Sequence, residues 1–229
     1  MKAAGKYEVA RFLQKIGVDT RFVSLVDDQI LINNLRFSCF SRVKEELFLE
    51  KHPQYKVSRS KIFQKICTRA SRVLKDVLSP RETIFLFQDG TCTSMALYAV
   101  LESYIRKYGV EIIFRQDMDD LGKLDLNSVA LPLTLDDEVE HIISMILDGE
   151  KLRLLSSEND NNGIKIIYPL IKVPRQWVQS WVENENFHCT VPECEGLPRE
   201  MLEFLEVFIP DVREKMYRSG VYLSSENDF

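Results

Sequence analysis

Hydrophobic positions recur along this chain at two spacings, one typical of helices and one typical of buried strands. Over residues 92–107 and 135–148 the apolar residues lie three or four positions apart, which predicts two amphipathic helices. Short β-prone runs occupy residues 83–87, 110–114 and 127–132. Because these strands alternate with helices, the pattern predicts an α/β fold with a doubly wound, mostly parallel sheet.

The first eighty residues have mainly helical spacing. They predict helices over 4–16 and 43–51, and a longer helix that opens at Ser58 and stops at Ser79-Pro80. The run Ile30-Leu31-Ile32 is long enough only for a short strand. We therefore expect an N-terminal helical extension in front of the α/β domain.

After a polar loop, a β-prone run covers residues 164–170, and Pro174 is well placed in the first turn of a helix that reaches Trp181. Two closing helices are predicted near 198–208 and 210–218. The predicted organisation is thus a helical, basic extension (1–81), a trimmed α/β domain (82–222) and a frayed tail (223–229).

Composition narrows the class of protein. The chain has 229 residues, of which 45% are hydrophobic and 28% charged, as in ordinary globular proteins. No apolar run approaches the roughly 20 residues that a membrane span needs. The five cysteines are odd in number and scattered, so we expect no disulfide framework and a cytoplasmic location.

The charge is distributed unevenly. The net charge is −5, yet residues 36–81 contain twelve Lys and Arg against four Asp and Glu. Such asymmetry favours a polyanionic partner, and the alternative is a pair of solvated helices. In the helix that opens at Ser58, the apolar side is expected to be buried, which leaves Arg59, Lys65, Arg69 and Arg72 facing outward. The candidate RNA-binding residues are Arg36, Arg42, Arg59, Lys61, Lys65, Arg69 and Arg72.

The turn between the run 83–87 and the next helix has the arrangement of an anion site. Backbone N–H groups and the helix dipole converge at such a turn. However, Asp89 brings a carboxylate to the place of phosphate oxygens, and Gly90 is the only glycine. The sequence predicts a nucleotide turn that has lost its ligand, made of Gln88, Asp89, Gly90, Thr91, Cys92 and Thr93.

Five short motifs, taken in order, resemble the PP-loop ATP pyrophosphatase family over about residues 82–222. The turn 88–93 occupies the place of the family's Ser-Gly-Gly-x-Asp-Ser fingerprint, with Gln88 at the serine and Cys92 at the aspartate. The stretches 134–140 and 169–176 resemble its acidic helix start and its Pro-Leu-x-x-Val-Pro element. Pro192-Glu193-Cys194 and Ser219-Gly220 occupy the places of its last two elements.

Within that family, Asn33–Phe40 and the basic helices resemble the cytosolic tRNA 2-thiolation complex, and its non-adenylating second subunit in particular. The resemblance implies a chain without a cofactor that binds tRNA and a catalytic PP-loop partner, which a ubiquitin-related carrier supplies with sulfur. Two alternatives stay open: a divergent, active ATP pyrophosphatase that adenylates tRNA, and a general RNA-binding module.

The resemblance also suggests ligand roles that compete with simpler ones. Asp136, Asp137 and Glu140 could hold Mg²⁺ or orient ATP, or they could be acidic residues favoured by a helix dipole. Cys92 at a helix start could be a stabilised thiolate or a small buried residue.

Two further groups of side chains are weaker candidates. His188, Cys189 and Cys194 offer no fourth ligand for zinc, so we expect no metal. Trp177 and Trp181 share one helix face, and with the closing helices they are candidates for core or for a partner surface.

Overall fold

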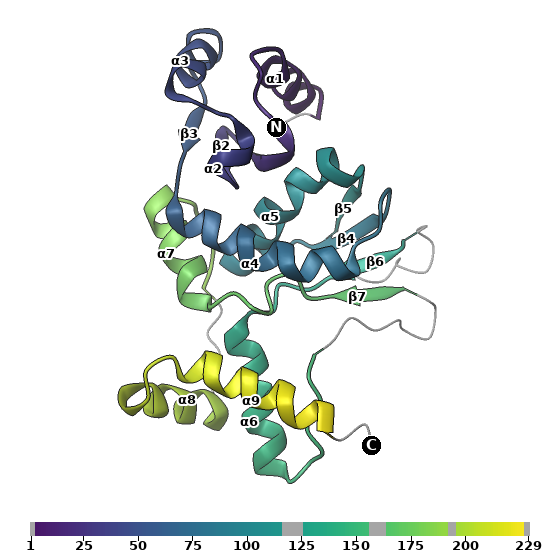
Figure 1. The fold of residues 1–229 in the computed structure, drawn as a ribbon, viewed down its shortest axis with the longest axis vertical. Helices are drawn as coiled ribbons and strands as arrows, with labels where there is room; N and C mark the ends of the chain where they lie inside the picture. Colours follow the sequence, from purple (N-terminus) through teal and green to yellow (C-terminus); the bar gives the residue numbers. More distant parts are fainter. Residues whose placement is uncertain (1–2, 116–125, 156–163, 192–195, 227–229) are drawn as a thin grey trace.

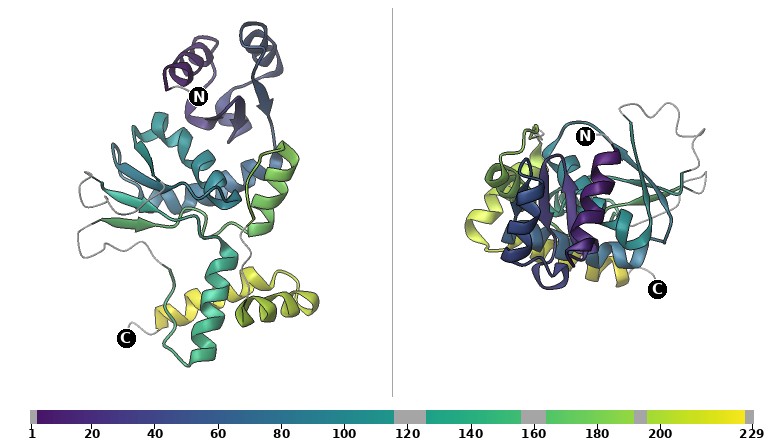
Figure 2. Two further views of the ribbon diagram at one scale, coloured as in Figure 1. Left: turned by 180° about the vertical axis from the view of Figure 1, so that it is seen from behind. Right: turned by 90° about the horizontal axis from the view of Figure 1, so that it is seen from above.

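The computed structural model describes residues 3–115, 126–155, 164–191 and 196–226. Figure 1 shows three parts in a row: a small N-terminal part, a central parallel sheet with its helices, and a helical C-terminal part. The chain begins at one end of this arrangement and finishes at the other, which the rear view in Figure 2 also shows. The α/β class predicted from the alternating pattern is confirmed.

The central sheet consists of parallel strands in the order β5-β4-β6-β7. The chain leaves β4 toward β5 on one side, and β6 then pairs with β4 on the other side. Open α/β sheets bind ligands at such a switch point, beyond the carboxyl ends of the strands. The elements are β4 (Thr83–Phe87), α5 (Cys92–Tyr108), β5 (Glu111–Arg115), β6 (Ser128–Ala130), α6 (Leu135–Asp148), β7 (Lys165–Ile167) and α7 (Arg175–Glu185).

The main core joins this sheet to α5, α7 and the preceding helix α4 (Lys61–Val77). The buried side of α4 includes Phe63, Ile66 and Leu74, and each such side chain contributes about 1.5–3 kcal/mol when fully buried. Trp181 of α7 is fully buried and stacks on Phe63, with ring centroids 4.9 Å apart. Trp181 is therefore part of the core and is not a partner contact.

The N-terminal part contains a second small sheet and its own core, so the prediction of a helical extension with one short strand at Ile30-Leu31-Ile32 is incomplete. The strand order is β1-β2-β3, with β1 antiparallel and β3 parallel to β2. Phe48 of α3 and Leu13 of α1 pack into this core. The elements are α1 (Ala3–Lys15), a 3₁₀ turn (Thr20–Phe22), β1 (Val23–Val26), β2 (Gln29–Ile32), α2 (Leu35–Ser38), α3 (Arg42–Lys51) and β3 (Lys56–Ser58).

The predicted helix start at Ser58 is wrong. Ser58 ends β3, and α4 begins at Lys61. Ser60 caps this helix, because its hydroxyl accepts a hydrogen bond from the Phe63 amide at 3.2 Å. Both serines have the residue type that caps helices, and pairing of β3 with β2 decides between them.

The C-terminal part is built on α6, which leaves the sheet and packs against α8 (Leu197–Phe208) and α9 (Val212–Glu226) (Figure 1). A Cβ atom at Gly220 would lie 2.9 Å from Ile142 Cδ1, so α9 approaches α6 closely there and a larger residue would displace the Ile142 side chain. The last helix continues past the predicted end at residue 218 to Glu226, and residues 227–229 lie outside the described residues.

In the described part of the chain, no helix combines the length and apolar character that crossing a membrane requires.

Candidate functional site

The turn after β4 is closed on itself by a carboxylate. Thr91 is the N-cap of α5, and its hydroxyl accepts a hydrogen bond from the Ser94 amide at 3.2 Å. The Asp89 carboxylate accepts hydrogen bonds from the Thr91 amide and hydroxyl, each at 2.8 Å. Gly90, between them, has a φ of 74°, a conformation that favours glycine. The Asp89 carboxylate therefore accepts hydrogen bonds from the turn that a bound anion would otherwise accept.

The ionisation of Asp89 reinforces this closure. Partial burial of the side chain raises its pKa, but the hydrogen bonds from Thr91 and Ser94 together outweigh that effect and hold the pKa below its usual value. The carboxylate is thus ionised at neutral pH and repels phosphate. Of the other residues of the predicted turn, Gln88 is exposed and Thr93 is buried.

The segment that follows α7 crosses the same turn. The Thr190 carbonyl accepts a hydrogen bond from the Cys92 amide at 2.9 Å, and the Thr190 amide donates to the Gly90 carbonyl at 3.0 Å. A disulfide joins Cys92 to Cys189, although the odd number and scattered positions of the cysteines favoured no disulfide framework. Sequence spacing could not reveal this pair, because 97 residues separate its members. Cys92 is buried, as its small side chain suggested.

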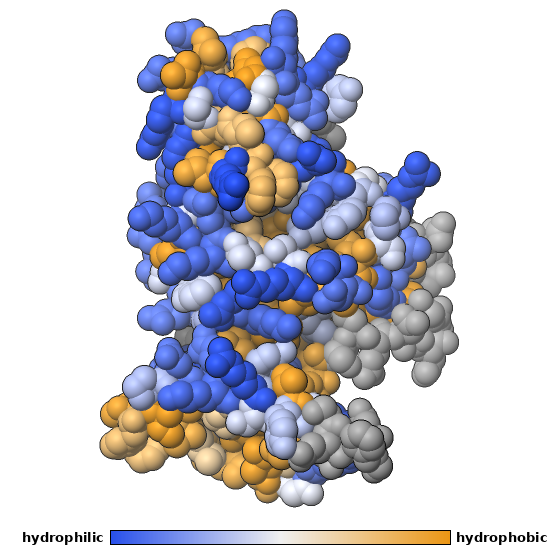
Figure 3. All heavy atoms as spheres, in the orientation of Figure 1, coloured by the Kyte–Doolittle hydropathy of each residue, from blue (hydrophilic) through white to orange (hydrophobic). Residues whose placement is uncertain are grey.

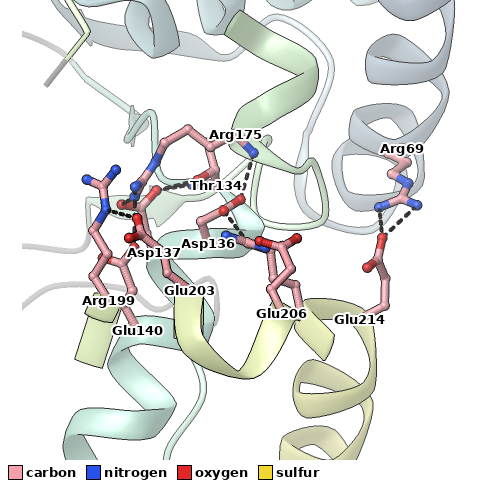
Figure 4. Close-up of polar contacts among 11 residues, drawn as sticks. Arg69, Thr134, Asp136, Asp137, Glu140, Arg175, Arg199, Glu203, Glu206 and Glu214 are labelled. Atoms are coloured by element: carbon pink, nitrogen blue, oxygen red, sulfur yellow. Dashed lines mark hydrogen bonds and ion pairs between the residues drawn. The ribbon is translucent and has the colours of Figure 1, made fainter. Parts of the chain in front are cut away.

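The acidic residues at the start of α6 lie at the carboxyl end of the neighbouring strand β6, and arginine side chains contact them (Figure 4). The Arg213 Nε atom lies 2.6 Å from Asp136 Oδ1, and the Arg175 amide donates to Asp136 Oδ2 at 2.7 Å. The Arg175 guanidinium lies 2.6 Å from Asp137 Oδ1 and 3.3 Å from Glu140 Oε1. All three candidate carboxylates are brought together, as the motif predicted, but each has an arginine partner.

These carboxylates do not fit a magnesium site. Asp137 also accepts hydrogen bonds from the amide and hydroxyl of Thr134, so it serves as half of a capping box. Burial raises the pKa of Glu140, and Arg175 opposes that shift. A metal ion would have to displace the Arg175 guanidinium to reach either carboxylate. Among the described residues, no three His, Cys, Asp or Glu side chains form a metal-binding group.

The proposed His188, Cys189 and Cys194 trio is only partly described, because Cys194 lies outside the described residues. Cys189 itself is paired with Cys92.

Two cavities flank the carboxyl ends of the strands. One, of about 430 Å³, lies beside the turn and is lined by Gln88, Gly90 and Thr91 together with the aromatic pair Tyr98 and Phe114. The other, of about 670 Å³, lies between α4, α7 and the C-terminal helices. Its walls carry four arginines and six carboxylates, so its own charge disfavours an anion.

The basic segment divides into paired and exposed cations. Arg59 does not face outward as predicted: its side chain is 16% exposed, pairs with Glu45 at 2.9 Å and donates to the Phe40 carbonyl. Arg42 also pairs with Glu45, at 3.1 Å. Arg69 pairs with Glu214 at 3.2 Å. The exposed candidates are Arg36, Lys61, Lys65 and Arg72, together with Arg42, whose side chain is 74% exposed despite its pair.

Lys61, Lys65, Arg69 and Arg72 share one side of α4, at the spacing of successive helical turns. The half-buried indole of Trp177 lies beside them, with Lys65 Nζ 5.4 Å and the Arg69 guanidinium 4.3 Å from the ring. These cation–π contacts join α4 to α7. The result is a cationic stripe, defined here as Lys61, Lys65 and Arg72 with Trp177 at its edge.

Sequence reasoning missed the arginines that neutralise the acidic helix start. Arg175 follows Pro174 inside the Pro-Leu-x-x-Val-Pro element, so the motif itself was the available signal. Arg213 has no such signal, because it lies 77 residues beyond its partner Asp136.

Comparison with known proteins establishes the fold. No family model matches the chain. A probable sulfurtransferase of Methanocaldococcus jannaschii is 31% identical over 94 residues, which are 40% of this chain and 28% of the relative, so the match spans less than a third of that protein. The solved U34-tRNA thiolase NcsA from Methanococcus maripaludis, with its 4Fe-4S cluster, has a TM-score of 0.54 and 16% identity, covering 76% of this chain and 83% of its own. The chain therefore has a thiolase-like α/β fold.

Proposed function

We propose that this chain is a non-catalytic, tRNA-binding subunit of a cytosolic tRNA wobble-uridine 2-thiolation system. In this proposal a catalytic PP-loop partner adenylates the uridine, and a ubiquitin-related carrier supplies sulfur to that partner. The observation that carries the proposal is the arginine pairing of Asp136, Asp137 and Glu140, because it removes the groups that would bind magnesium. The thiolase-like fold and the sulfurtransferase similarity support the pathway.

The closed turn supports the same proposal. A phosphate bound before α5 would meet the ionised Asp89 carboxylate and would compete with Thr190 for the Cys92 amide. Two like charges about 4 Å apart repel by about 4 kcal/mol near a protein surface. ATP binding in an orientation suitable for adenylation is therefore disfavoured.

The cationic stripe on α4 supports RNA binding. Lys61, Lys65 and Arg72 are exposed, and they lie at helical intervals along one side, an arrangement that suits a run of phosphates. Contacts to phosphates position an RNA without reading its sequence. Trp177 at the edge of the stripe offers an aromatic face.

An apolar face on α8 supports the association with a protein partner. Phe204, Val207 and Phe208 are 64%, 78% and 67% exposed. Figure 3 shows hydrophobic residues gathered at the lower left of the molecule, where α8 lies in Figure 1. Apolar side chains exposed together are typical of an interaction surface.

The catalytic question is tested by measuring ATP binding and pyrophosphate release with magnesium and tRNA. The cavity of about 430 Å³ beside the turn is the observation that favours the alternative of an active ATP pyrophosphatase, and this assay tests that alternative. We expect no pyrophosphate release from the chain alone. Release that disappears in Asp136→Ala but persists in Glu203→Ala, at an exposed acid, would establish the alternative.

The RNA question is tested by charge reversal on the stripe. We expect Lys65→Glu/Arg72→Glu to weaken tRNA binding and to lower the salt slope by about 0.7–0.9 for each phosphate that the protein no longer neutralises. The matched control, Arg11→Glu/Lys15→Glu, reverses two exposed cations on α1. Equal effects of the two double variants would reject the stripe, and binding of unrelated RNAs as tight as that of tRNA would favour a general RNA-binding module.

A further inference from the structure

Cys92 and Cys189 connect the turn before α5 to the segment that follows α7. Their Cα atoms are 5.0 Å apart, a distance typical of disulfides. Cys92 is the first residue of α5 and is buried, whereas Cys189 is partly exposed. The remaining cysteines in the described part of the chain, Cys39 and Cys67, are free.

Phe187 anchors the start of this segment in the core against Trp181, and beyond it the contacts with the turn are mainly backbone hydrogen bonds. Residues Thr91 and Thr190 form an isolated parallel bridge, with the backbone hydrogen bonds that connect Thr190 to Cys92 and Gly90. The Thr190 hydroxyl adds a hydrogen bond to the Gly90 carbonyl at 3.2 Å. Hydrogen bonds between exposed residues such as Thr190 and Gly90 open more readily than those of a core strand. The disulfide is the covalent link that joins this end of the segment to α5.

We propose that Cys92 and Cys189 are a reversible dithiol–disulfide pair that fastens residues 187–190 across the turn at the start of α5. A small dithiol reduces it: a thiolate of the dithiol attacks the partly exposed Cys189 sulfur, and Cys92 leaves as a thiolate. The dipole of α5 stabilises that leaving group. The second thiol of the reductant then releases Cys189 and leaves the reductant as a disulfide.

Oxidation runs by the same chemistry in reverse. The Cys189 thiolate attacks a low-molecular-weight disulfide and forms a mixed disulfide, and Cys92 then displaces the second small thiol. Two protein thiols and one small disulfide thus yield the protein disulfide and two small thiols. This site acts on the turn alone and does not depend on tRNA binding.

The first experiment measures whether the pair is reversible. The full chain is equilibrated at a series of ratios of reduced to oxidised dithiothreitol, quenched in acid, unfolded and alkylated, and its peptides are analysed by mass spectrometry. We expect Cys92 and Cys189 to be joined at the oxidised end of the series and alkylated at the reduced end. A bond that persists at every ratio would mean a fixed structural bond, and a pair that is alkylated at every ratio would mean no bond; either overturns the proposal.

The second experiment measures whether the bond fastens the segment. On reduction we expect the Cys92 and Thr190 amides to exchange hydrogen at least about tenfold faster, and the Tm to fall on the order of 5–10 °C. Cys189→Ser should behave as the reduced protein in either buffer. Cys39→Ser, at an exposed free cysteine, should retain the response of the unaltered chain.

The reduced protein and Cys189→Ser both lack the disulfide, so the reduced protein can replace the variant in this test if the variant folds poorly. Exchange at Cys92 and Thr190 that is equally slow in the oxidised and the reduced chain would overturn the proposed fastening.

Discussion

Two corners of the molecule lie at the carboxyl ends of the adjacent strands β4 and β6, and internal contacts close them in different ways. At the turn after β4, an exposed carboxylate is satisfied by nearby amides and hydroxyls. At the start of α6, the carboxylates, including the buried Asp136, pair with arginines from distant parts of the chain. The first arrangement is local, so removing it should lower the free energy of unfolding only slightly. Removing an arginine from the second leaves buried charges unpaired and should lower that free energy much more.

The largest effect is expected from breaking the α6 corner at Arg175. Its side chain is 11% exposed and contacts both Asp137 and Glu140. We predict that Arg175→Ala lowers the free energy of unfolding by about 3–5 kcal/mol, because two partly buried carboxylates lose their partner. Urea unfolding at pH 7 measures this change.

Arg21 provides the matched control, because its side chain is 59% exposed in its pair with Asp19. Arg21→Ala should lower the free energy of unfolding much less than Arg175→Ala, because water screens an exposed ion pair. If the two variants were equally stable, the arginines at the α6 corner would be ordinary surface charges.

A smaller effect is expected at Glu138, which lies on the same helix and has no arginine partner among the described residues. Burial raises its pKa to about 7, although the Leu155 amide, which donates to the carboxylate, opposes the shift. Because the pKa is raised in the folded state, the stabilising contribution is complete below the ordinary pKa near 4.5 and is lost as the pH rises through 7. The loss amounts to at most about 3 kcal/mol.

Comparison with Glu138→Gln isolates this contribution. We predict that the variant gains stability relative to the unaltered chain between pH 5 and pH 8, measured by urea unfolding at both values. Glu203→Gln, at an exposed acid, should show no such gain. A constant difference between Glu138→Gln and the unaltered chain at both pH values would contradict the raised pKa.

The same division between local and distant contacts explains what the sequence could predict. The ends of α5 and α6 were predicted within a residue, because Gly109 and Gly149 adopt the left-handed conformation that ends a helix. The acidic residues of the α6 corner were also predicted. Their arginine partners were not, since Arg175 lies 39 residues beyond Asp136, and only tertiary packing brings them together.

The basic segment shows the limit of reasoning from charge alone. The helical spacing correctly placed Lys65 and Arg72 on an exposed side of α4. It wrongly placed Arg59 there, because that residue precedes the helix and turns toward Glu45 and the Phe40 carbonyl. A count of cations gives the net field of a segment, but it does not identify which cations have internal partners.

The smallest effect is expected from breaking the turn at Asp89. Its carboxylate bonds only to nearby groups, and the side chain is exposed, so Asp89→Ala should cost about 1 kcal/mol or less, as when a helix cap is removed. Because the pKa of Asp89 is lowered, this contribution is present above the ordinary pKa near 4 and is lost as the pH falls below it. Asp89→Asn keeps an acceptor oxygen and should lose less than Asp89→Ala when both are unfolded in urea at pH 7. If Asp89→Ala proved as costly as Arg175→Ala, the turn would be held as firmly as the α6 corner, and the contrast between a local and a distant closure would fail.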